Sequence, residues 1–294
     1  MTATPGHDPL ASPIKREATD GASIAVTKHG AHVLSWRPAG SIADMLFVSS
    51  RATAANGAAI RGGVPVIFPQ FAGRGPLQKH GFARNIAWRE IDAAEVGFVA
   101  ARESAVAAFE LTDDAATRAI WPHPFRARFA AVAEGQSLRL ELTVINIGDA
   151  DVEFTAALHT YLAVDDCTAC RVTGLEDAHF VGTAHADAER GPEGQPIAFG
   201  VEVDRIYRRS TPVGSADPSP ICRLETPGRT VEIANDGLDD TVVWNPGPDV
   251  GAKIADLGPG EWQRFICIEA GAILAPIRLA PGARWTAAQL LQAA

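Results

Sequence analysis

Two titratable side chains, His159 and Glu269, stand in sequence contexts that favour acid–base chemistry. His159 lies on the more polar face of the alternating segment 152–162 (VEFTAALHTYL), and Glu269 ends the apolar run 265–268. A carboxylate on such a strand lies either at a rim or in a partly desolvated pocket, where its pKa rises toward that of a useful general base. A structural histidine and a merely solvated glutamate would leave the same pattern, and spacing cannot pair the two residues.

The charge along the chain is uneven. The whole chain has 26 Lys and Arg against 35 Asp and Glu, a formal net charge of −9. Residues 45–89 nevertheless contain no Asp or Glu. Their six basic residues are Arg51, Arg61, Arg74, Lys79, Arg84 and Arg89. The planar fork of arginine matches the oxygens of a phosphate, and the glycines and prolines of this window predict ligand-binding loops. Pairing of these cations with acids elsewhere in the fold explains the window equally well.

Several motifs of known chemistry are absent from the sequence. There is no GxxxxGK[ST] loop, GxSxG elbow or HExxH helix, and Gly73-Arg-Gly75 lacks the third glycine of a dinucleotide fingerprint. Cys167-Thr-Ala-Cys170 has redox or half-zinc-site spacing, but no second CxxC follows it. We therefore expect two incidental thiols there, and chemistry without a metal, a cofactor or a covalent nucleophile.

The elements that must position these residues are predicted to be short β-strands. Apolar and polar side chains alternate in 138–147 (LRLELTVINI) as they do in 152–162. Gly, Pro, Asp or Asn punctuate most of the further short apolar runs, which are 23–27, 32–36, 45–48, 127–133, 230–234, 241–244 and 264–268. Weak helical patterns occur only in 50–60 and 114–119. The pattern predicts an all-β, antiparallel sandwich or barrel.

The 294 residues leave room for two domains, but no repeat or linker divides them. We expect one domain over residues 21–294, a frayed or extended tail over 1–20, and an exposed loop over 184–200. The tail lacks the apolar core of a signal peptide, so we expect a cytoplasmic protein. The acidic net charge argues against nucleic acid or an anionic membrane as a partner.

A set of motifs then occurs in a fixed order along the chain: IRGGVPVIFPQF, LQKHGFAR, LHTYL, VDRIY, VVWNPG, KIADLGPGEW, ICIEAG and LAPGARW. Together they resemble the hexose-6-phosphate mutarotases (glucose-6-phosphate 1-epimerases) of the aldose 1-epimerase superfamily, from about residue 20 to the C-terminus. The resemblance implies a monomeric, single-domain antiparallel β-supersandwich. It also implies interconversion of the α and β anomers of a hexose 6-phosphate, with glucose 6-phosphate favoured and no cofactor or metal.

The same resemblance implies roles for individual residues. His159 of LHTYL resembles the general acid of the family, and Glu269 of ICIEAG resembles its general base. The implied substrate ligands are Arg61 and Arg84 for the phosphate, and His80 and Asp204 for the oxygens of the sugar ring.

Two positions depart from the family pattern, and other functions stay open. Lys79 stands where relatives often have Gln or Ser, which adds a possible phosphate contact. Gly247 stands where the family's WNPW has tryptophan, so an aromatic side chain at the rim of the site is missing. The alternatives are an aldose 1-epimerase for unphosphorylated sugars and a non-catalytic sugar-binding β-sandwich. A glycosidase is disfavoured because it needs two opposed carboxylates.

Overall fold

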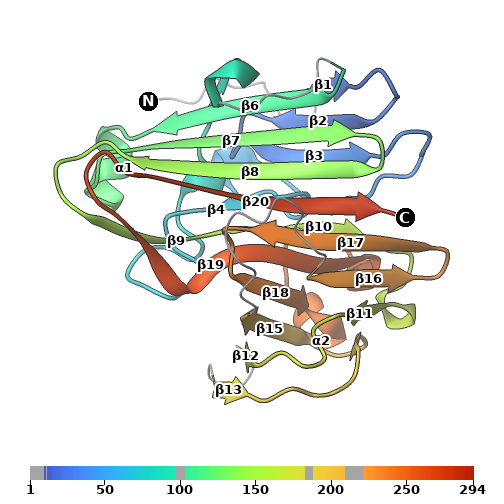
Figure 1. Cartoon of the computed structure of the whole chain (residues 1–294). Coiled ribbons are helices and arrows are strands. Elements are labelled where there is room, and N and C mark those ends of the chain that lie inside the picture. Colours follow the sequence, from blue (N-terminus) through green and yellow to red (C-terminus); the bar gives the residue numbers. More distant parts are fainter. Residues whose placement is uncertain (1–9, 11, 97–102, 183–187, 209–220) are drawn as a thin grey trace.

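Antiparallel β-strands are the dominant regular elements of the described chain (Figure 1). The computed structural model describes residues 10, 12–96, 103–182, 188–208 and 221–294. Strand pairing is antiparallel in all three sheets. The expected all-β class is confirmed.

The largest sheet has nine strands in the order β14-β11-β16-β17-β20-β8-β7-β6-β5. In chain order these are β5 (Arg89–Ile91), β6 (Ala105–Thr112), β7 (Phe125–Glu134), β8 (Ser137–Asn146), β11 (Arg171–Thr173), β14 (Ile197–Ala198), β16 (Cys222–Thr226), β17 (Arg229–Asp236) and β20 (Arg284–Ala293). Figure 1 shows its long members β7, β8, β20 and β17 running side by side.

The second sheet has eight strands, seven of them in the order β13-β12-β15-β18-β19-β9-β4, with β10 also paired to β19. In chain order these are β4 (Val66–Ile67), β9 (Val152–Leu158), β10 (Tyr161–Ala163), β12 (Phe180–Gly182), β13 (Ala188–Arg190), β15 (Val203–Arg208), β18 (Asp240–Asn245) and β19 (Phe265–Leu279). β19 is central, because β18 pairs with one edge of it and β9 and β10 with the other.

A small three-stranded sheet and a few short helices complete the fold. The sheet contains β1 (Ile14–Glu17), β2 (Ser23–Thr27) and β3 (His32–Arg37), and it lies against β6 and β7. The α-helices are α1 (Ala115–Ile120) and α2 (Gly247–Gly251). The 3₁₀ turns are Ala55–Gly57, Ala83–Asn85, Ala93–Val96, Cys167–Ala169 and Glu261–Arg264.

Some expected boundaries differ from the observed ones. The expected tail includes β1, which pairs with β2. The expected loop over 184–200 contains β13 and β14, while residues 183–187 lie outside the described part. The expected helix at 114–119 is α1, capped by the Asp114 side chain, which accepts a hydrogen bond from the Thr117 N–H. Of the helical pattern in 50–60, only the 3₁₀ turn Ala55–Gly57 forms.

The hydrophobic core lies between the two large sheets. In β8 the predicted alternation is confirmed, because Leu138, Leu140 and Leu142 are buried while Arg139 and Glu141 are partly exposed. Burial of such a leucine contributes about 1.5–3 kcal/mol relative to exposure. One apolar cluster joins side chains from both sheets, which fixes them face to face.

The strand expected over 152–162 is interrupted at the residue of greatest interest. β9 ends at Leu158 and β10 begins at Tyr161, so His159 and Thr160 lie in a gap between them. At this gap the His159 N–H donates to the carbonyl of Pro65 at 3.0 Å, outside the ladder with β19. The prediction that His159 lies within a regular strand is therefore wrong by one residue.

No helix in the described ranges has the length and apolar character needed to cross a membrane.

Candidate active site

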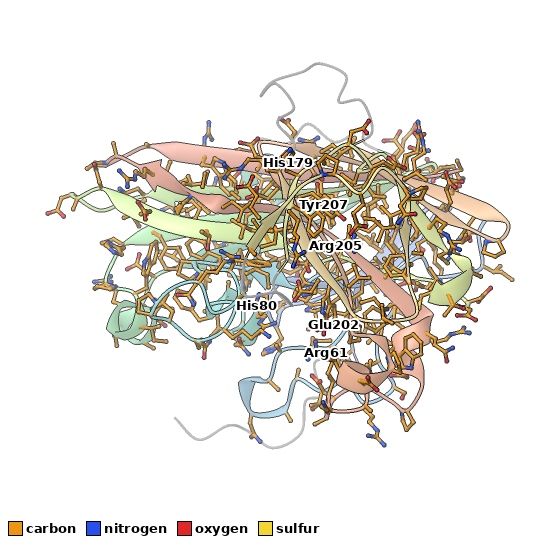
Figure 2. The ribbon with its side chains drawn as sticks, turned by 90° about the horizontal axis from the view of Figure 1, so that it is seen from below. Arg61, His80, His179, Glu202, Arg205 and Tyr207 are labelled. Atoms are coloured by element: carbon orange, nitrogen blue, oxygen red, sulfur yellow. The ribbon has the colours of Figure 1, made fainter. Side chains whose placement is uncertain are left out.

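A cavity of about 670 Å³ lies over β15, β18 and β19 and is bordered by loops from the segment 61–84. The residues predicted from the sequence all line it: Arg61, Lys79, His80, Arg84, His159, Asp204 and Glu269. Figure 2 shows Arg61, His80 and Glu202 approaching this space from different parts of the chain. The fold thus brings together residues that are widely separated in sequence.

His159 and Glu269 are in direct contact. The Nε2 atom of His159 lies 3.3 Å from Oε1 of Glu269, and the two side chains are only 9% and 2% exposed. Leu158 pairs with Ala270 and Tyr161 with Cys267, and this common register places His159 opposite Glu269. The pair is therefore set by the alignment of neighbouring strands.

Aromatic rings hold the His159 imidazole in place. It stacks on Tyr161 with the ring centres 4.8 Å apart and the planes inclined by 9°. Trp244 meets it edge-on at 5.9 Å. Because Tyr161 lies two residues after His159, the two rings stand on the same face of the chain. This packing leaves the imidazole little freedom to leave Glu269.

Burial favours the neutral forms of both members of the pair in the empty cavity. Burial, followed by the charges of His80 and Arg84, holds the pKa of His159 well below 6.5. Burial, followed by the charge of Asp204, raises the pKa of Glu269 well above 4.5. The Nδ1 atom of His159 and the Oε2 atom of Glu269 have no hydrogen-bond partner. Each side chain of the pair therefore keeps one buried polar atom without a protein partner.

His80 is a neutral imidazole on a strained turn. Its φ is +68°, and its backbone N–H donates to Ala72 O at 3.0 Å. The Ala72 N–H donates to His80 Nδ1 at 3.3 Å, which places the ring proton on Nε2. Burial, followed by the charges of Arg84 and Lys79, lowers the pKa of His80 to about 2. His80 can thus donate one hydrogen bond to a ligand without carrying charge.

Arg61 is already held by protein groups. Its guanidinium donates to Asp256 Oδ1 through Nε at 3.1 Å and to the Tyr161 hydroxyl through Nη1 at 3.0 Å. Burial alone would lower the pKa of Arg61, but Tyr161 and Asp256 raise it above its usual value. Arg61 therefore pairs with Asp256, an acid that lies outside the acid-free segment 45–89.

Arg84 stands in a different position. Its Nη2 donates to the backbone carbonyl of Lys79 at 3.1 Å, and its buried Nε has no partner. No carboxylate of the described residues forms an ion pair with Arg84 or Lys79. Burial lowers the pKa of Arg84, yet a guanidinium keeps its charge in a protein. The cavity therefore holds an uncompensated cation suited to an anionic ligand.

The 3₁₀ turn Ala83–Asn85 that carries Arg84 packs tightly on the β2–β3 turn. A Cβ at Gly30, whose φ is +71°, would lie 2.8 Å from the carbonyl oxygen of Arg84. His32 supports the Arg61 loop in a similar way, because its Nε2–H donates to Gly62 O at 2.7 Å. Burial lowers the pKa of His32 to about 3. The loops of the cavity are thus fixed by the small sheet.

Several residues of the site escaped prediction. Trp244 and Glu202 line the cavity, Tyr161 stacks on His159, and Asp256 holds Arg61. Tyr161, Trp244 and Asp256 all lie inside the ordered motifs, in LHTYL, VVWNPG and KIADLGPGEW. The one local signal for Tyr161 was its spacing, since an aromatic residue two positions after His159 can lie on the same face of a strand.

Gly247 is buried and has no room for a side chain. Its φ is +62°, and a Cβ there would lie 2.6 Å from the backbone nitrogen of Glu202. Its N–H donates to the Asn245 side chain at 2.9 Å at the start of α2. The close approach of the Glu202 backbone gives a physical reason for the departure from WNPW.

The CxxC thiols lie in the core. Cys167 and Cys170 are free and buried in the apolar cluster, and Cys167 lies in the 3₁₀ turn before β11. Burial, followed by the charge of Asp166, raises the pKa of Cys167 to about 12, so it is a poor thiolate. Among the described residues, no three His, Cys, Asp or Glu side chains converge as metal ligands.

The aldose 1-epimerase family model matches residues 14–292, so the chain belongs to the aldose 1-epimerase family. A protein of Cenchrus ciliaris provisionally named glucose-6-phosphate 1-epimerase is 34% identical over 262 residues, or 87% of this chain and 77% of that protein. A Salmonella typhimurium protein with the same provisional name is 31% identical over 291 residues, or 93% of this chain and 91% of that one.

A solved structure agrees with this assignment. The crystal structure of a provisionally named mutarotase from Salmonella typhimurium matches with a TM-score of 0.80 at 27% identity, over 93% of this chain and 87% of that chain. The expected mutarotase-type β-supersandwich is confirmed.

Proposed function

We propose that this protein interconverts the α and β anomers of hexose 6-phosphates, with glucose 6-phosphate favoured. The observation that carries the proposal is the His159–Glu269 contact of 3.3 Å in a cavity that also contains Arg84 and Lys79. A proton donor, a proton acceptor and an uncompensated positive charge thus face one sugar-sized space. The names of the relatives from Cenchrus ciliaris and Salmonella typhimurium support the same activity.

The reaction opens and recloses the C1–O5 bond of the sugar ring. Glu269 takes the proton of the C1 hydroxyl while His159 gives a proton to O5, and the bond breaks to leave an aldehyde. The aldehyde rotates about C1–C2, and O5 attacks its other face while the two side chains exchange roles. Each positioned proton transfer contributes about 10²- to 10⁴-fold. One proton enters and one leaves at each step, so the pair ends as it began.

The pair holds the right number of protons for this step. A neutral His159 beside a protonated Glu269 contains the same protons as an imidazolium beside a carboxylate. The two forms differ by one transfer across the 3.3 Å contact. Arg84 is among the charges that hold the pKa of His159 down. A bound phosphate offsets this positive charge, which favours the imidazolium form in the complex.

The phosphate orients the sugar. Arg84 and Lys79 present their charges without a described carboxylate partner, and Arg61 joins them if the phosphate competes with Asp256. His80 and Asp204 complete the set as ligands of the ring oxygens. Because the phosphate is remote from C1, its binding contributes positioning rather than chemistry.

The proposal extends to assembly and compartment. We propose a monomeric enzyme, as the likeness to the mutarotases implies. A phosphorylated sugar is charged and stays within the compartment that makes it, which supports action in the cytoplasm on a small-molecule substrate.

The direct test measures exchange between the two anomers of glucose 6-phosphate by NMR magnetisation transfer. The wild type should raise the exchange rate well above the spontaneous one. His159→Ala and Glu269→Gln should each lower kcat about 10²-fold or more. His123→Ala, outside the cavity, is the matched control and should behave as the wild type. A wild type that leaves exchange at the spontaneous rate would exclude the proposal.

A further inference from the structure

Gln289 is a fully buried amide in the sheet that faces the active-site strands. It lies on β20, opposite Leu140 of β8 and Asn235 of β17, with 0% of its surface exposed. A buried amide is costly unless its polar atoms are bonded. Both are bonded here, because Thr160 Oγ1 donates to Oε1 at 2.5 Å and Nε2 donates to Ile268 O at 3.0 Å. The amide therefore bridges the two large sheets.

The two bonds end beside the proposed acid and base. Thr160 directly follows His159, and Ile268 directly precedes Glu269. Adjacent side chains point to opposite faces of a sheet. The side chains of Thr160 and Ile268 are buried on the core side of the sheet, while those of His159 and Glu269 line the cavity. Gln289 thus reaches both members of the pair from behind the sheet.

The amide also replaces a missing bond of the strand ladder. The Ile268 N–H donates to Thr160 O at 3.1 Å, which is one of the two bonds that such an antiparallel pair exchanges. The Thr160 N–H donates to Leu158 O at 3.1 Å instead of returning the second bond. The Ile268 carbonyl is left to Gln289. The irregularity that frees His159 from the ladder is closed by this side chain.

From this geometry we infer that Gln289 is a positioning residue that sets the spacing of His159 and Glu269, an inference that rests on the proposed mutarotase activity. It holds the backbone on both sides of the pair at the one place where the ladder does not. Without it, the β9–β10 junction relaxes and the donor and acceptor lose their alignment. Binding of the phosphate by Arg84 is unaffected, because Arg84 lies on a separate loop.

The first test compares Gln289→Leu with Leu291→Val. Gln289→Leu keeps the volume and removes both hydrogen bonds, whereas Leu291→Val trims the core on the same face of β20. Gln289→Leu should lower kcat for anomer exchange about tenfold or more with KM little changed, since small misplacements of reacting groups are expensive. Leu291→Val should keep the wild-type kcat. Thr160→Val should resemble Gln289→Leu, and the double variant should be no worse than either alone.

Gln289→Glu separates positioning from packing. A protonated carboxyl donates and accepts as the amide does, whereas an ionised one only accepts. Relative to the wild type at each pH, kcat of Gln289→Glu should be preserved at low pH and fall as pH rises. A constant ratio across pH, or a Gln289→Leu variant with wild-type kcat and KM, would overturn the inference.

A readout without substrate keeps this inference separate from the proposed function. In the ligand-free protein, Gln289→Leu should shift the imidazole NMR resonances of His159 and its titration, and leave those of His123 in place. If the wild type proves to have no mutarotase activity, a shifted His159 still supports positioning by Gln289. Unchanged His159 resonances overturn it, whatever the activity.

Discussion

Tyr161 stacks on the imidazole of His159 while its hydroxyl accepts a hydrogen bond from Arg61. One side chain therefore touches both the proposed acid and a proposed phosphate ligand. Burial raises the pKa of Tyr161, so the hydroxyl stays protonated. This arrangement ties the position of the His159 ring to the loop that carries Arg61.

Tyr161→Phe should separate these two contacts. The variant keeps the stacked ring and loses one hydrogen bond from Arg61, which is worth about 0.5–1.5 kcal/mol. We expect KM for glucose 6-phosphate to change by less than about tenfold with kcat nearly unchanged. Tyr161→Ala should lower kcat as well, because His159 loses its support. Steady-state kinetics of the two variants check this, and a Tyr161→Ala variant with wild-type kcat would contradict it.

Arg84→Ala should discriminate between phosphorylated and free sugar. A hydrogen bond to a charged group contributes about 1.5–3 kcal/mol, so kcat/KM for glucose 6-phosphate should fall about 10- to 100-fold. The rate with free glucose should change little. Arg89→Ala is the matched control, because Arg89 belongs to the same basic segment but pairs with Glu110. Equal losses for the two sugars would assign Arg84 to the fold and favour an unphosphorylated substrate.

The pH dependence should follow the shared proton of the pair. Below the lowered pKa of His159 the pair binds a second proton and loses its base, and above the raised pKa of Glu269 it loses its acid. We expect a bell-shaped profile of kcat/KM. Asp204→Asn should move the alkaline limb to lower pH, because the charge of Asp204 raises the pKa of Glu269. A limb that stays in place or moves upward would refute this assignment.

His32 should make the fold sensitive to acid. Its pKa is about 3 in the folded protein and about 6.5 when unfolded, so its contribution is complete above pH 6.5 and is lost as pH falls. At pH 5 this loss amounts to about 2 kcal/mol. His32→Gln keeps a donor for Gly62 and does not titrate. Urea unfolding at pH 7 and pH 5 should show a smaller drop for the variant, and equal drops would disprove the prediction.

A side chain at residue 247 should destabilise the protein. Gly247→Ala places a Cβ against the backbone of Glu202 and strains a φ of +62°. We expect a loss of about 1–3 kcal/mol, and a larger one for Gly247→Trp. Gly260→Ala is the control, since its φ is +76° but a Cβ there meets nothing within 4 Å. Thermal unfolding measures both, and the prediction fails if Gly247→Ala is no less stable than Gly260→Ala.

Local patterning predicted much of this molecule. The alternation in β8 placed Leu138 and Leu140 in the core correctly, and the ordered motifs named residues that share one cavity. Local patterning could not predict the contact between His159 and Glu269, because the register of strands from distant segments is a non-local property. The partner of Arg61, Asp256, was hidden for the same reason.

The buried position of Gln289 could not be predicted from the sequence for a different reason. In a strand with exposed and buried positions, a lone glutamine is expected to face solvent. Its actual place depends on which face of β20 meets the other sheet, and on a missing ladder bond at Thr160. Neither has a local signature in the sequence.

The 3.3 Å contact between His159 and Glu269 has a consequence for the protons exchanged in each turnover. In the proposed mechanism the pair gives up one proton and takes up one in each half of the cycle, so turnover needs no net proton from the solvent. After each turnover both side chains are back in their starting protonation states, so the site can bind either anomer next. Such an enzyme accelerates the conversion of α to β and of β to α by the same factor, and the equilibrium ratio of the anomers is set by the sugar alone.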